Sequence, residues 1–413
     1  MTSLSIVKRK PILTIFYQFN PWQTSIGGIQ TLIKSFIKYA PREFEVRLVG
    51  TGSSSEQTNL KWQEAEFSGR EVHFLPLLTL ENDDVRGRIP TTVKYSAALL
   101  GRKFNSDFMH FHRLEPSLAA IPWRSEKTLF IHNDIRTQIK ATGDKKAILW
   151  RRFPGTYFAI ESLLVRQFNQ ILSCNTDSAE LYKQHYPSLA ERVSYIKNSF
   201  DSEIFYPLGL SERKAKRREL ALKLGLNEDT AFILFAGRLH PQKDPVLLVR
   251  SLAALNQPNV HLLIAGNGEL RDEVQAEITQ LGLSKQVTIL GSVTQAELAE
   301  LHRVSNVFVL TSVYEGLPLV VLEALASGTP IVTTRTGETP KFLTTDSGIV
   351  CEERTPESIA DALRKVLLHP DDYPIKSCAC PAQPYAASTV IREAYSDMWE
   401  RYQKRCSQLV QLN

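Results

Sequence analysis

The sequence is poor in the residues that build metal centres and disulfide frameworks. Its 413 residues contain five cysteines at scattered positions, which are Cys174, Cys351, Cys378, Cys380 and Cys406. Cys378 and Cys380 have no histidine or second cysteine pair near them at the spacing of zinc ligands. The pattern therefore predicts reduced thiols, as in a cytoplasmic protein, and argues against both a metal site and a disulfide-stapled domain.

Long hydrophobic runs are also missing. None approaches the roughly 18 residues that a membrane-spanning helix needs. Lys8, Arg9 and Lys10 precede the short apolar stretch 12–17, an order that signal peptides share. The stretch is short and lacks a small-residue cleavage site, so we expect a first buried strand instead. The basic residues are spread out and form no nucleic-acid-binding motif, which argues against nucleic acid as a partner.

The composition that remains is that of an ordinary globular enzyme. Hydrophobic residues make up 43% and charged residues 23%, and the length is enough for two or three domains, each with its own core. The charge is uneven. Residues 1–200 have 27 Lys and Arg against 18 Asp and Glu, a net charge of +9, whereas residues 201–413 have 22 against 26, a net charge of −4. Such an asymmetry bears on the partners of each half.

Short apolar runs rich in β-branched residues alternate with amphipathic stretches along the chain. In the second half, strands are expected at 231–236, 260–265, 287–290, 307–310 and 330–334. Each is apolar nearly throughout, which is typical of a parallel sheet covered on both faces. The expected helices between them cover 245–254, 269–280, 295–303 and 319–327. This alternation predicts a doubly wound α/β domain.

The first half shows the same alternation less regularly. Strands are expected near 11–17, 44–50, 71–75, 107–111, 128–132 and 170–174, and the polar stretch 52–70 is expected to be a loop. We therefore predict two Rossmann-like domains, 1–203 and 204–385. A final helix within 386–413 is expected to pack back on the first domain. The charge run 212–219 is expected to be a solvated helix face.

Ligands bind at the carboxyl ends of the strands in such sheets, so chemistry is expected where strands turn into helices. In the first half, Gly27 and Gly28 open a helix, where backbone amides can approach a phosphate. In the second half, Gly237 and Arg238 end a strand and Lys243 lies in the next loop. Two cations at this spacing are suited to the phosphates of a nucleoside diphosphate, although surface positions would give the same pattern.

The segment 311–324 is the most informative part of the sequence. Glu315 lies in its loop, and Glu323 interrupts an otherwise apolar helix. A carboxylate before a helix is often only complementary to the helix dipole. A buried carboxylate without a partner, in contrast, costs several kcal/mol, and the hydroxyl groups of a ligand would satisfy it.

These residues resemble the retaining family 4 glycosyltransferases, which have the GT-B fold: two Rossmann-like doubly wound domains that face each other across a cleft. The similarity is strongest from Gly237 to Gly348 and most specific in the block 315–330. Its elements are Gly237-Arg238-Leu239 with Lys243, the stretch 265–270, the pair Glu315 and Glu323, and 328–332. In the first half Gly27-Gly28, 110–112, 132–134, Asn198 and Asp201 match more loosely.

The resemblance implies a role for each matching position. Arg238 and Lys243 would hold the donor diphosphate and stabilise the departing nucleotide, so that neither metal nor cofactor is required. Glu323 would bind the ribose hydroxyls and Glu315 those of the transferred sugar. The remaining expected site residues are Gly237, the segment of Gly316, Leu317 and Leu319, Gly28 from the first domain, and His132 beside the reacting sugar.

Lys341 stands where this family often has Glu, and Asp244 where it often has Gly. The first departure weakens inferences about the neighbouring loop. Retention of configuration is expected from the resemblance. Because Glu315 and Glu323 would both bind hydroxyls, we expect front-face displacement instead of a covalent intermediate, with Arg238 and Lys243 neutralising the developing charge.

The acceptor domain is expected to be the basic first half. There Lys145, Lys146, Arg151 and Arg152 surround Trp150, Phe153, Tyr157 and Phe158. This mixture suits an anionic membrane surface, and it equally suits an amphipathic helix with snorkelling cations. We therefore expect a cytoplasmic hexosyltransferase of glycolipid or polysaccharide biosynthesis. It would act on a lipid-linked or envelope-glycan acceptor and associate peripherally with the inner face of the plasma membrane.

Two alternatives stay open: a nucleotide-sugar epimerase or hydrolase of the same fold, and a non-catalytic nucleotide-sugar-binding subunit. Release of free sugar would favour the former. The intact set of Arg238, Lys243, Glu315 and Glu323 disfavours the latter. A dinucleotide oxidoreductase is disfavoured because Gly266-Asn267-Gly268 is followed by Arg271 where a third glycine would stand.

Overall fold

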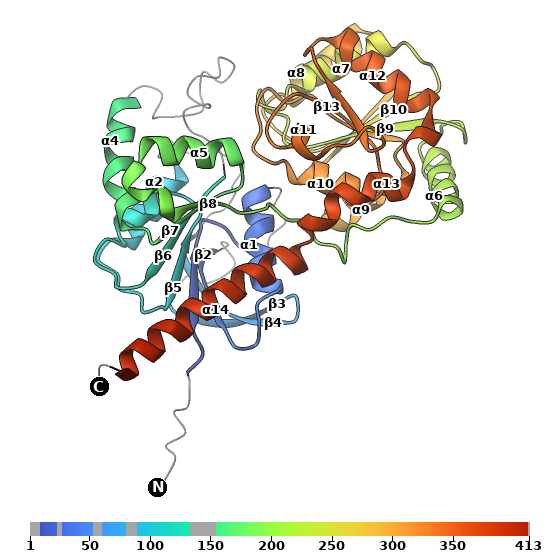
Figure 1. Ribbon diagram of the computed structural model, residues 1–413. Coiled ribbons are helices and arrows are strands. Elements are labelled where there is room, and N and C mark those ends of the chain that lie inside the picture. The colour runs from blue at the N-terminus through green and yellow to red at the C-terminus, as the bar shows by residue number, and fades with distance from the viewer. Residues whose placement is uncertain (1–8, 23–26, 53–59, 80–88, 133–153, 412–413) are drawn as a thin grey trace. The chain divides into compact units, whose positions relative to one another are not determined.

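The computed structural model describes residues 9–22, 27–52, 60–79, 89–132 and 154–411. These residues form two compact units. Unit 1 contains the chain up to His132, then the part that ends at Ile196, and finally the C-terminal segment from Ser388. Unit 2 contains Lys197–Ala387. Each unit is built around one sheet (Figure 1).

Unit 1 is built on an eight-stranded sheet with the order β3-β4-β2-β1-β5-β6-β7-β8. All neighbouring pairs are parallel except β3 and β4. The strands β1, β5, β6 and β7 in its middle are buried nearly throughout. Their bounds are β1 Ile12–Phe16, β2 Glu45–Gly52, β3 Gln63–Phe67, β4 Arg70–Thr79, β5 Phe108–Phe111, β6 Glu126–Ile131, β7 Gln170–Ser173 and β8 Val193–Tyr195.

The expectation of a loop at 52–70 is wrong for its last part. Strand β3 lies there and pairs antiparallel with β4, from Gln63 opposite Phe74 to Phe67 opposite Arg70. Its sequence, Gln-Glu-Ala-Glu-Phe, has a low strand propensity, and none of its residues is fully buried. Pairing with β4 overrides that propensity. The charged side chains suit an edge strand, which must resist further pairing.

The helices of unit 1 complete its layers. The right-handed crossover rule places α2, α4 and α5 on the face of the sheet opposite α1. Tyr395 of the long helix α14 contacts Phe36 of α1, which places α14 on the α1 side (Figure 1). The bounds are α1 Gly28–Lys38, α2 Thr91–Leu99, η1 Glu115–Leu118, α4 Pro154–Leu164, η3 Val165–Gln167, α5 Thr176–His185, η4 Pro187–Arg192 and α14 Ala387–Gln411.

Helix α14 is fastened to unit 1 by a buried tyrosine. The Tyr395 hydroxyl donates a 2.7 Å hydrogen bond to the Phe36 carbonyl, one of the last carbonyls of α1, which have no partner within the helix. We expect Tyr395→Phe to lower the free energy of unfolding by about 1–2 kcal/mol, because the carbonyl stays buried without its donor. Urea unfolding measures this. The matched control is Tyr402→Phe, whose hydroxyl bonds the carbonyl of the exposed Arg9 at 3.1 Å, and an equal loss there would contradict the argument.

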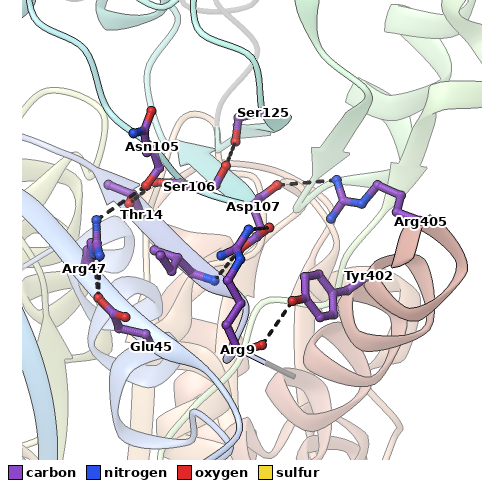
Figure 2. Close-up of polar contacts among 11 residues, drawn as sticks. Arg9, Thr14, Glu45, Arg47, Asn105, Ser106, Asp107, Ser125, Tyr402 and Arg405 are labelled. Atoms are coloured by element: carbon purple, nitrogen blue, oxygen red, sulfur yellow. Dashed lines mark hydrogen bonds and ion pairs between the residues drawn. The ribbon is translucent and has the colours of Figure 1, made fainter. Parts of the chain in front are cut away.

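Charged groups reinforce this attachment at the amino-terminal edge of the sheet (Figure 2). The Asp107 carboxylate accepts two hydrogen bonds from the Arg9 guanidinium, both 2.8 Å long, and one from the Ile12 amide. From α14, Arg405 donates to the Asp107 carbonyl at 3.5 Å. Arg405 also forms an ion pair with Glu126, as does Arg401. The start of β1, the start of β5 and the end of α14 are thereby joined.

Unit 2 is built on a six-stranded sheet with the order β11-β10-β9-β12-β13-β14, and every neighbouring pair is parallel. In chain order this is 3-2-1-4-5-6, the order of a doubly wound Rossmann sheet. The order reverses between β9 and β12, and a ligand crevice is expected beyond the carboxyl ends of these two strands. The bounds are β9 Ala231–Ala236, β10 Val260–Ala265, β11 Val287–Gly291, β12 Val307–Leu310, β13 Ile331–Thr334 and β14 Gly348–Cys351.

The helices of unit 2 cover both faces of this sheet and enclose a large aliphatic core. The first four are α6 Leu210–Lys223, α7 Pro245–Leu255, α8 Arg271–Gln280 and α9 Gln295–Val304. The others are α10 Leu319–Ala326, α11 Thr339–Phe342, α12 Pro356–Leu368, η5 Pro370–Asp372, α13 Ile375–Ala379 and η6 Cys380–Tyr385. Among the described residues of the whole chain, no helix is both long and apolar enough to cross a membrane.

The charge run 212–219 is a helix, as predicted, but one of its cations is not solvated. Arg213 is buried, and its guanidinium donates to the Gly328 and Ser305 carbonyls and to the Thr329 hydroxyl. Burial lowers the pKa of Arg213 to about 10. The Arg213 side chain can be buried because carbonyl oxygens from distant segments accept its hydrogen bonds. The local charge pattern of the sequence does not indicate these contacts.

Candidate active site

The candidate site in unit 2 begins with three glycines that bring two strand ends together. A Cβ atom at Gly266, after β10, would lie 1.9 Å from the Gly237 carbonyl oxygen, and one at Gly268 would lie 2.3 Å from the Leu239 carbonyl oxygen. Gly237 has φ +157° and Gly266 +148°, conformations that L side chains rarely adopt. The Gly237 amide donates to the Ala265 carbonyl and the Leu239 amide to the Asn267 carbonyl. The loop that carries Arg238 is therefore fixed by direct backbone packing.

The loops after β9 and β12 meet in an ion pair. Lys243 Nζ lies 2.5 Å from Glu315 Oε1, and the exposed fractions of the two side chains are 17% and 7%. The Ser312 hydroxyl donates to the same carboxylate oxygen at 2.6 Å. The Lys243 side chain passes beside Gly237, with Cε 3.6 Å from the position a Cβ would occupy there. The structure thus joins two predicted site residues, Lys243 and Glu315, at the point where the strand order reverses.

Further hydrogen bonds brace these two loops. The Val313 amide donates to the Gln242 carbonyl at 2.8 Å, and Gln242 Nε2 donates to the Tyr314 carbonyl at 3.0 Å. The Thr311 hydroxyl lies within hydrogen-bond distance of the Lys243 and Asp244 carbonyls. Since both loops are held at several points, the Lys243 ammonium is positioned before any ligand binds.

Arg238 differs from Lys243 in its surroundings. It is exposed, and among the described residues no side chain is hydrogen-bonded or ion-paired to its guanidinium. It lies directly after the braced Gly237 at the carboxyl end of β9. Its charge is therefore free to meet an anionic ligand, whereas that of Lys243 is already shared with Glu315.

Glu323 lies in the middle of α10 and is buried. No hydrogen-bond donor to its carboxylate is found in the described parts of the chain, although its backbone carbonyl accepts one from Ser327. Desolvation raises the pKa of Glu323 to about 8, against an ordinary value of 4.5. A carboxylate buried without donors has a large unmet demand for hydrogen bonds, which the hydroxyls of a ligand would meet.

The segment that leads into α10 is held from two sides. Asn198 Nδ2 donates to the Leu317 carbonyl at 2.8 Å, and the Glu338 amide donates to the Gly316 carbonyl at 2.9 Å. Gly337 has φ +60°, and a Cβ there would lie 2.0 Å from the Gly316 carbonyl oxygen. These contacts fix the backbone of the predicted donor-binding residues Gly316, Leu317 and Leu319, the last of which begins α10.

In unit 1 the predicted residues lie at the corresponding edge of the other sheet. Gly28 is the first residue of α1, and its N-cap Gly27 has no side-chain cap. Helix α1 follows β1, and the order of this sheet reverses at β1, which has β2 on one side and β5 on the other. The first amides of the helix, to which no described side chain gives a cap, therefore lie at the edge where a doubly wound sheet binds ligands.

His132 follows β6 and belongs to a group of neutral rings. His132 Nε2 lies 3.0 Å from His112 Nδ1, and the two rings are stacked. Cys174 Sγ lies 3.9 Å from His132 Nδ1. Desolvation, with a smaller contribution from Arg113, lowers the pKa of His132 to about 3, and burial also lowers that of His112. His132 is therefore a neutral hydrogen-bonding group at neutral pH.

Several residues of the unit 2 site were not expected from the sequence. Ser312, Gln242 and Thr311 contribute hydrogen bonds to the two loops, and Gly337 approaches Gly316 from the loop after β13. A polar Thr-Ser pair directly after the apolar strand β12 was the available signal for two of them. No local pattern indicates the contact with Gly337, because it joins segments that are distant in sequence.

The expected membrane surface at 145–158 lies mostly outside the described residues. Of its aromatic members only Tyr157 and Phe158 are described. Tyr157 is buried within unit 1, so its inclusion in an exposed surface is wrong. Its ring packs edge-to-face against that of Phe158, with the ring centroids 5.5 Å apart.

Comparison with known proteins agrees with this geometry. Residues 216–376 match the family described as "Glycosyl transferases group 1". An uncharacterized glycosyltransferase of Methanocaldococcus jannaschii is 29% identical over 247 residues, 59% of each chain. A D-inositol 3-phosphate glycosyltransferase of Corynebacterium glutamicum is 29% identical over 207 residues, 48% of this chain and 49% of that protein. The matched part of the chain thus spans about half to three-fifths of these relatives.

Solved structures match nearly the whole chain. Sucrose-phosphate synthase from Thermosynechococcus elongatus has a TM-score of 0.78 at 16% identity and covers 96% of this chain and 100% of its own. Anabaena HepE in complex with UDP and glucose has a TM-score of 0.70 at 17% identity, with 94% and 100% covered. WaaG, a glycosyltransferase involved in lipopolysaccharide biosynthesis, has a TM-score of 0.70 at 16% identity, with 94% and 99% covered. The chain therefore has the GT-B fold, and its residues 216–376 are similar to the glycosyl transferases of group 1.

Proposed function

We propose that the protein transfers a hexosyl group, with retention of configuration and without a metal ion, from a nucleoside diphosphate sugar to a lipid-linked or envelope-glycan acceptor. The observation that carries the donor side is the constellation beyond β9 and β12. There a preformed Lys243–Glu315 pair is accompanied by Arg238 and the buried Glu323, two charged side chains for which the described residues provide no partner. All of them follow the two strands at which the sheet order reverses. The two cations, Arg238 and Lys243, suit the two phosphates of a nucleoside diphosphate. The Glu323 carboxylate suits the two hydroxyls of its ribose.

The solved neighbours support a nucleotide donor. The HepE crystal structure is a complex with UDP and glucose, and the starch synthase IV catalytic domain of Arabidopsis thaliana is bound to ADP and acarbose. In this chain we assign Arg238 and Lys243 to the diphosphate and Glu323 to the ribose hydroxyls. The backbone around Gly237 and from Gly316 to Leu319 would approach the phosphates and the sugar. From unit 1, Gly28 would meet the diphosphate and the neutral His132 would hydrogen-bond the transferred sugar.

The first experiment is thermal stabilisation by UDP-, GDP- and ADP-sugars. At a ligand concentration of 100 times Kd, a true donor adds about 2.7 kcal/mol to the free energy of unfolding. We expect one nucleotide to stabilise the wild type and to have little effect on Arg238→Ala and Glu323→Ala. If no nucleotide stabilises the protein, the proposed function fails. Release of free sugar at the rate of transfer would instead favour a hydrolase or an epimerase.

The pKa of Glu323 predicts a pH dependence that Glu323→Gln should abolish. The folded-state pKa of about 8 lies above the ordinary 4.5, so the folded state binds one proton more than the unfolded state between these values. Stability therefore falls as pH rises through this window, by roughly 1.4 kcal/mol per pH unit at most. The free energy of unfolding of the wild type, relative to that of Glu323→Gln, should fall from pH 5 to pH 8. Above pH 8 the difference between the two proteins should stay constant. Urea unfolding at each pH measures the difference, and parallel curves throughout would refute the assignment.

Nucleotide affinity should show the opposite trend. The ribose hydroxyls donate to the ionised carboxylate, so nucleotide binding should strengthen as pH rises toward 8. In Glu323→Gln this trend should be lost and the affinity at pH 8 lowered. Titration calorimetry with the nucleotide that stabilises the wild type measures both effects.

For the chemical step we propose front-face displacement. The Glu315 carboxylate is bound by Lys243 and Ser312 and is therefore not a free nucleophile. The leaving diphosphate would accept the proton of the acceptor hydroxyl on the same face, while Arg238 and Lys243 stabilise its developing charge. The anomeric configuration of the product, read by NMR, tests retention, and a trapped glycosyl adduct on Glu315 would refute the mechanism. Activity that survives a chelator is the expected result for metal independence.

The acceptor side of the proposal rests on unit 1. The excess of positive charge lies in the first 200 residues, which contain 27 Lys and Arg but only 18 Asp and Glu. A basic acceptor domain suits a substrate held in an anionic bilayer. WaaG, a neighbour in fold, is involved in lipopolysaccharide biosynthesis. The protein would therefore work in the cytoplasm, peripherally attached to the inner face of the plasma membrane.

A further inference from the structure

Helix α2 has a second apolar stripe that no part of the described chain covers. Tyr95 and Leu99 form its inner face and are fully buried. Val93, Ala97 and Leu100 follow one another at helical spacing, three or four residues apart, and all three are exposed. The exposed fraction is 44% for Val93 and 55% for Leu100. An apolar stripe on the solvent side is not needed for packing α2 on the sheet.

The neighbouring turn extends this stripe. Helix α2 packs against η1, and Leu118 and Ile121 in and after η1 are 48% and 52% exposed. The Trp123 indole donates a 2.8 Å hydrogen bond to the Arg102 carbonyl, which ties the segment after η1 to the one after α2. Four large aliphatic side chains from two adjacent segments are therefore exposed on one part of unit 1. Such a concentration of exposed apolar residues is typical of an interaction site.

Cations alternate with these aliphatic residues. Lys94, Lys103 and Arg124 are exposed, and no acidic partner of theirs is found among the described residues. Residues 89–124 contain two acidic residues, Asp107 and Glu115. Asp107 already forms an ion pair with Arg9, so Glu115 is the one carboxylate of this segment left to offset the three cations. We call Val93, Leu100, Leu118 and Ile121, together with these three cations, the α2–η1 surface. It is apolar and positively charged at once.

We infer that the α2–η1 surface docks on an anionic lipid bilayer, with its aliphatic side chains in the interface and its cations on the lipid phosphates. Long cationic side chains that flank aliphatic residues suit such an interface, because their heads reach the phosphates while their stems stay apolar. A second copy of the chain fits less well, since a two-fold dimer would place these cations against themselves. Protein interfaces, moreover, are depleted in lysine and enriched in aromatic residues, whereas this surface has two lysines and no aromatic residue.

The inference rests on the proposed lipid-linked acceptor and specifies how the enzyme would reach it. It also replaces part of the surface expected from sequence, where Tyr157 is buried. Docking through unit 1 would keep the enzyme in the layer that holds the acceptor while the nucleotide sugar arrives from the aqueous side.

Co-sedimentation with vesicles tests the inference. The full chain should bind vesicles of equal parts phosphatidylglycerol and phosphatidylcholine at low ionic strength, and much less to phosphatidylcholine alone. The charge variant is the triple substitution Lys94→Gln/Lys103→Gln/Arg124→Gln. It should lower the partition coefficient roughly 100-fold, because each lost cation should lower it by about a factor of five. Leu100→Gln/Ile121→Gln should lower it about tenfold. The matched control, Leu222→Gln/Lys223→Gln on α6, changes a 60% exposed leucine and an exposed lysine of unit 2 and should bind as the wild type does.

Three results would overturn the inference. They are no binding of the wild type to anionic vesicles, equal binding by the charge variant, and a dimer in light scattering that either surface variant dissociates. Thermal unfolding with and without the nucleotide shows that each variant is folded and keeps its donor site. Because that response is assigned to residues outside the α2–η1 surface, chiefly Arg238 and Glu323 of unit 2, failure to bind vesicles is distinguishable from failure of the proposed transferase function.

Discussion

Arg238→Ala should lower kcat/KM for transfer about 100- to 1,000-fold and leave the free energy of unfolding within about 0.5 kcal/mol of the wild type. The two effects separate because Arg238 is exposed and, in the described chain, holds no other side chain. Its whole role would be toward the ligand. A preorganised cation that faces the leaving diphosphate acts mainly as charge develops, so kcat should fall more than KM rises.

The control for Arg238 is Arg218→Ala on α6, which removes an exposed arginine of the same unit. It should change neither activity nor stability. Initial rates with the nucleotide sugar selected by thermal stabilisation, together with urea unfolding of both variants, measure the outcome. If Arg238→Ala transfers sugar at the wild-type rate, Arg238 is not part of the diphosphate site. If Arg218→Ala loses activity as well, the effect is one of net charge.

Lys243→Met should affect stability as well as activity. It leaves the Glu315 carboxylate, only 7% exposed, without its cation. Removing one partner of a buried ion pair costs about 3–5 kcal/mol, because the remaining charge keeps its desolvation penalty. Transfer should fall by at least the 100-fold expected for one preorganised charge. Urea unfolding and initial rates measure the two losses separately.

A double variant shows which loss is structural. Lys243→Met/Glu315→Leu replaces the buried pair by apolar side chains, an exchange that is often neutral for stability. We expect it to regain most of the free energy of unfolding and to remain inactive. Recovery of activity together with stability would mean that Lys243 acts only by supporting the fold. No recovery of stability would mean that the pair is not the main interaction of either residue.

The sequence was most informative where one local pattern determines both structure and chemistry. Apolar strands in unit 2, such as 231–236 and 260–265, were predicted with their observed bounds, because strands buried on both faces are apolar nearly throughout. Glu323 was noticeable for the same reason, as a carboxylate within an apolar helix. The structure adds that it is buried and has no hydrogen-bonded donor in the described chain.

The failures share a physical cause. Strand β3 is stabilised by its pairing with β4 and not by its own propensity, and Arg213 is buried because carbonyls from distant segments accept its hydrogen bonds. The pairing of Lys243 with Glu315 likewise joins residues that are far apart in sequence. In each case the decisive contact is non-local, whereas composition and periodicity describe only neighbours along the chain.

The return of α14 to unit 1 has a consequence for the order of folding during synthesis. Unit 2 includes the continuous stretch Lys197–Ala387, so this part is available to fold as soon as the ribosome has released it. Unit 1 is completed only by the segment from Ser388 onward, and the Tyr395–Phe36 hydrogen bond spans 359 positions. The half that begins synthesis therefore finishes folding last. A nascent chain stalled before α14 would carry a finished unit 2 and an unfinished unit 1, with the exposed core of unit 1 available to chaperones.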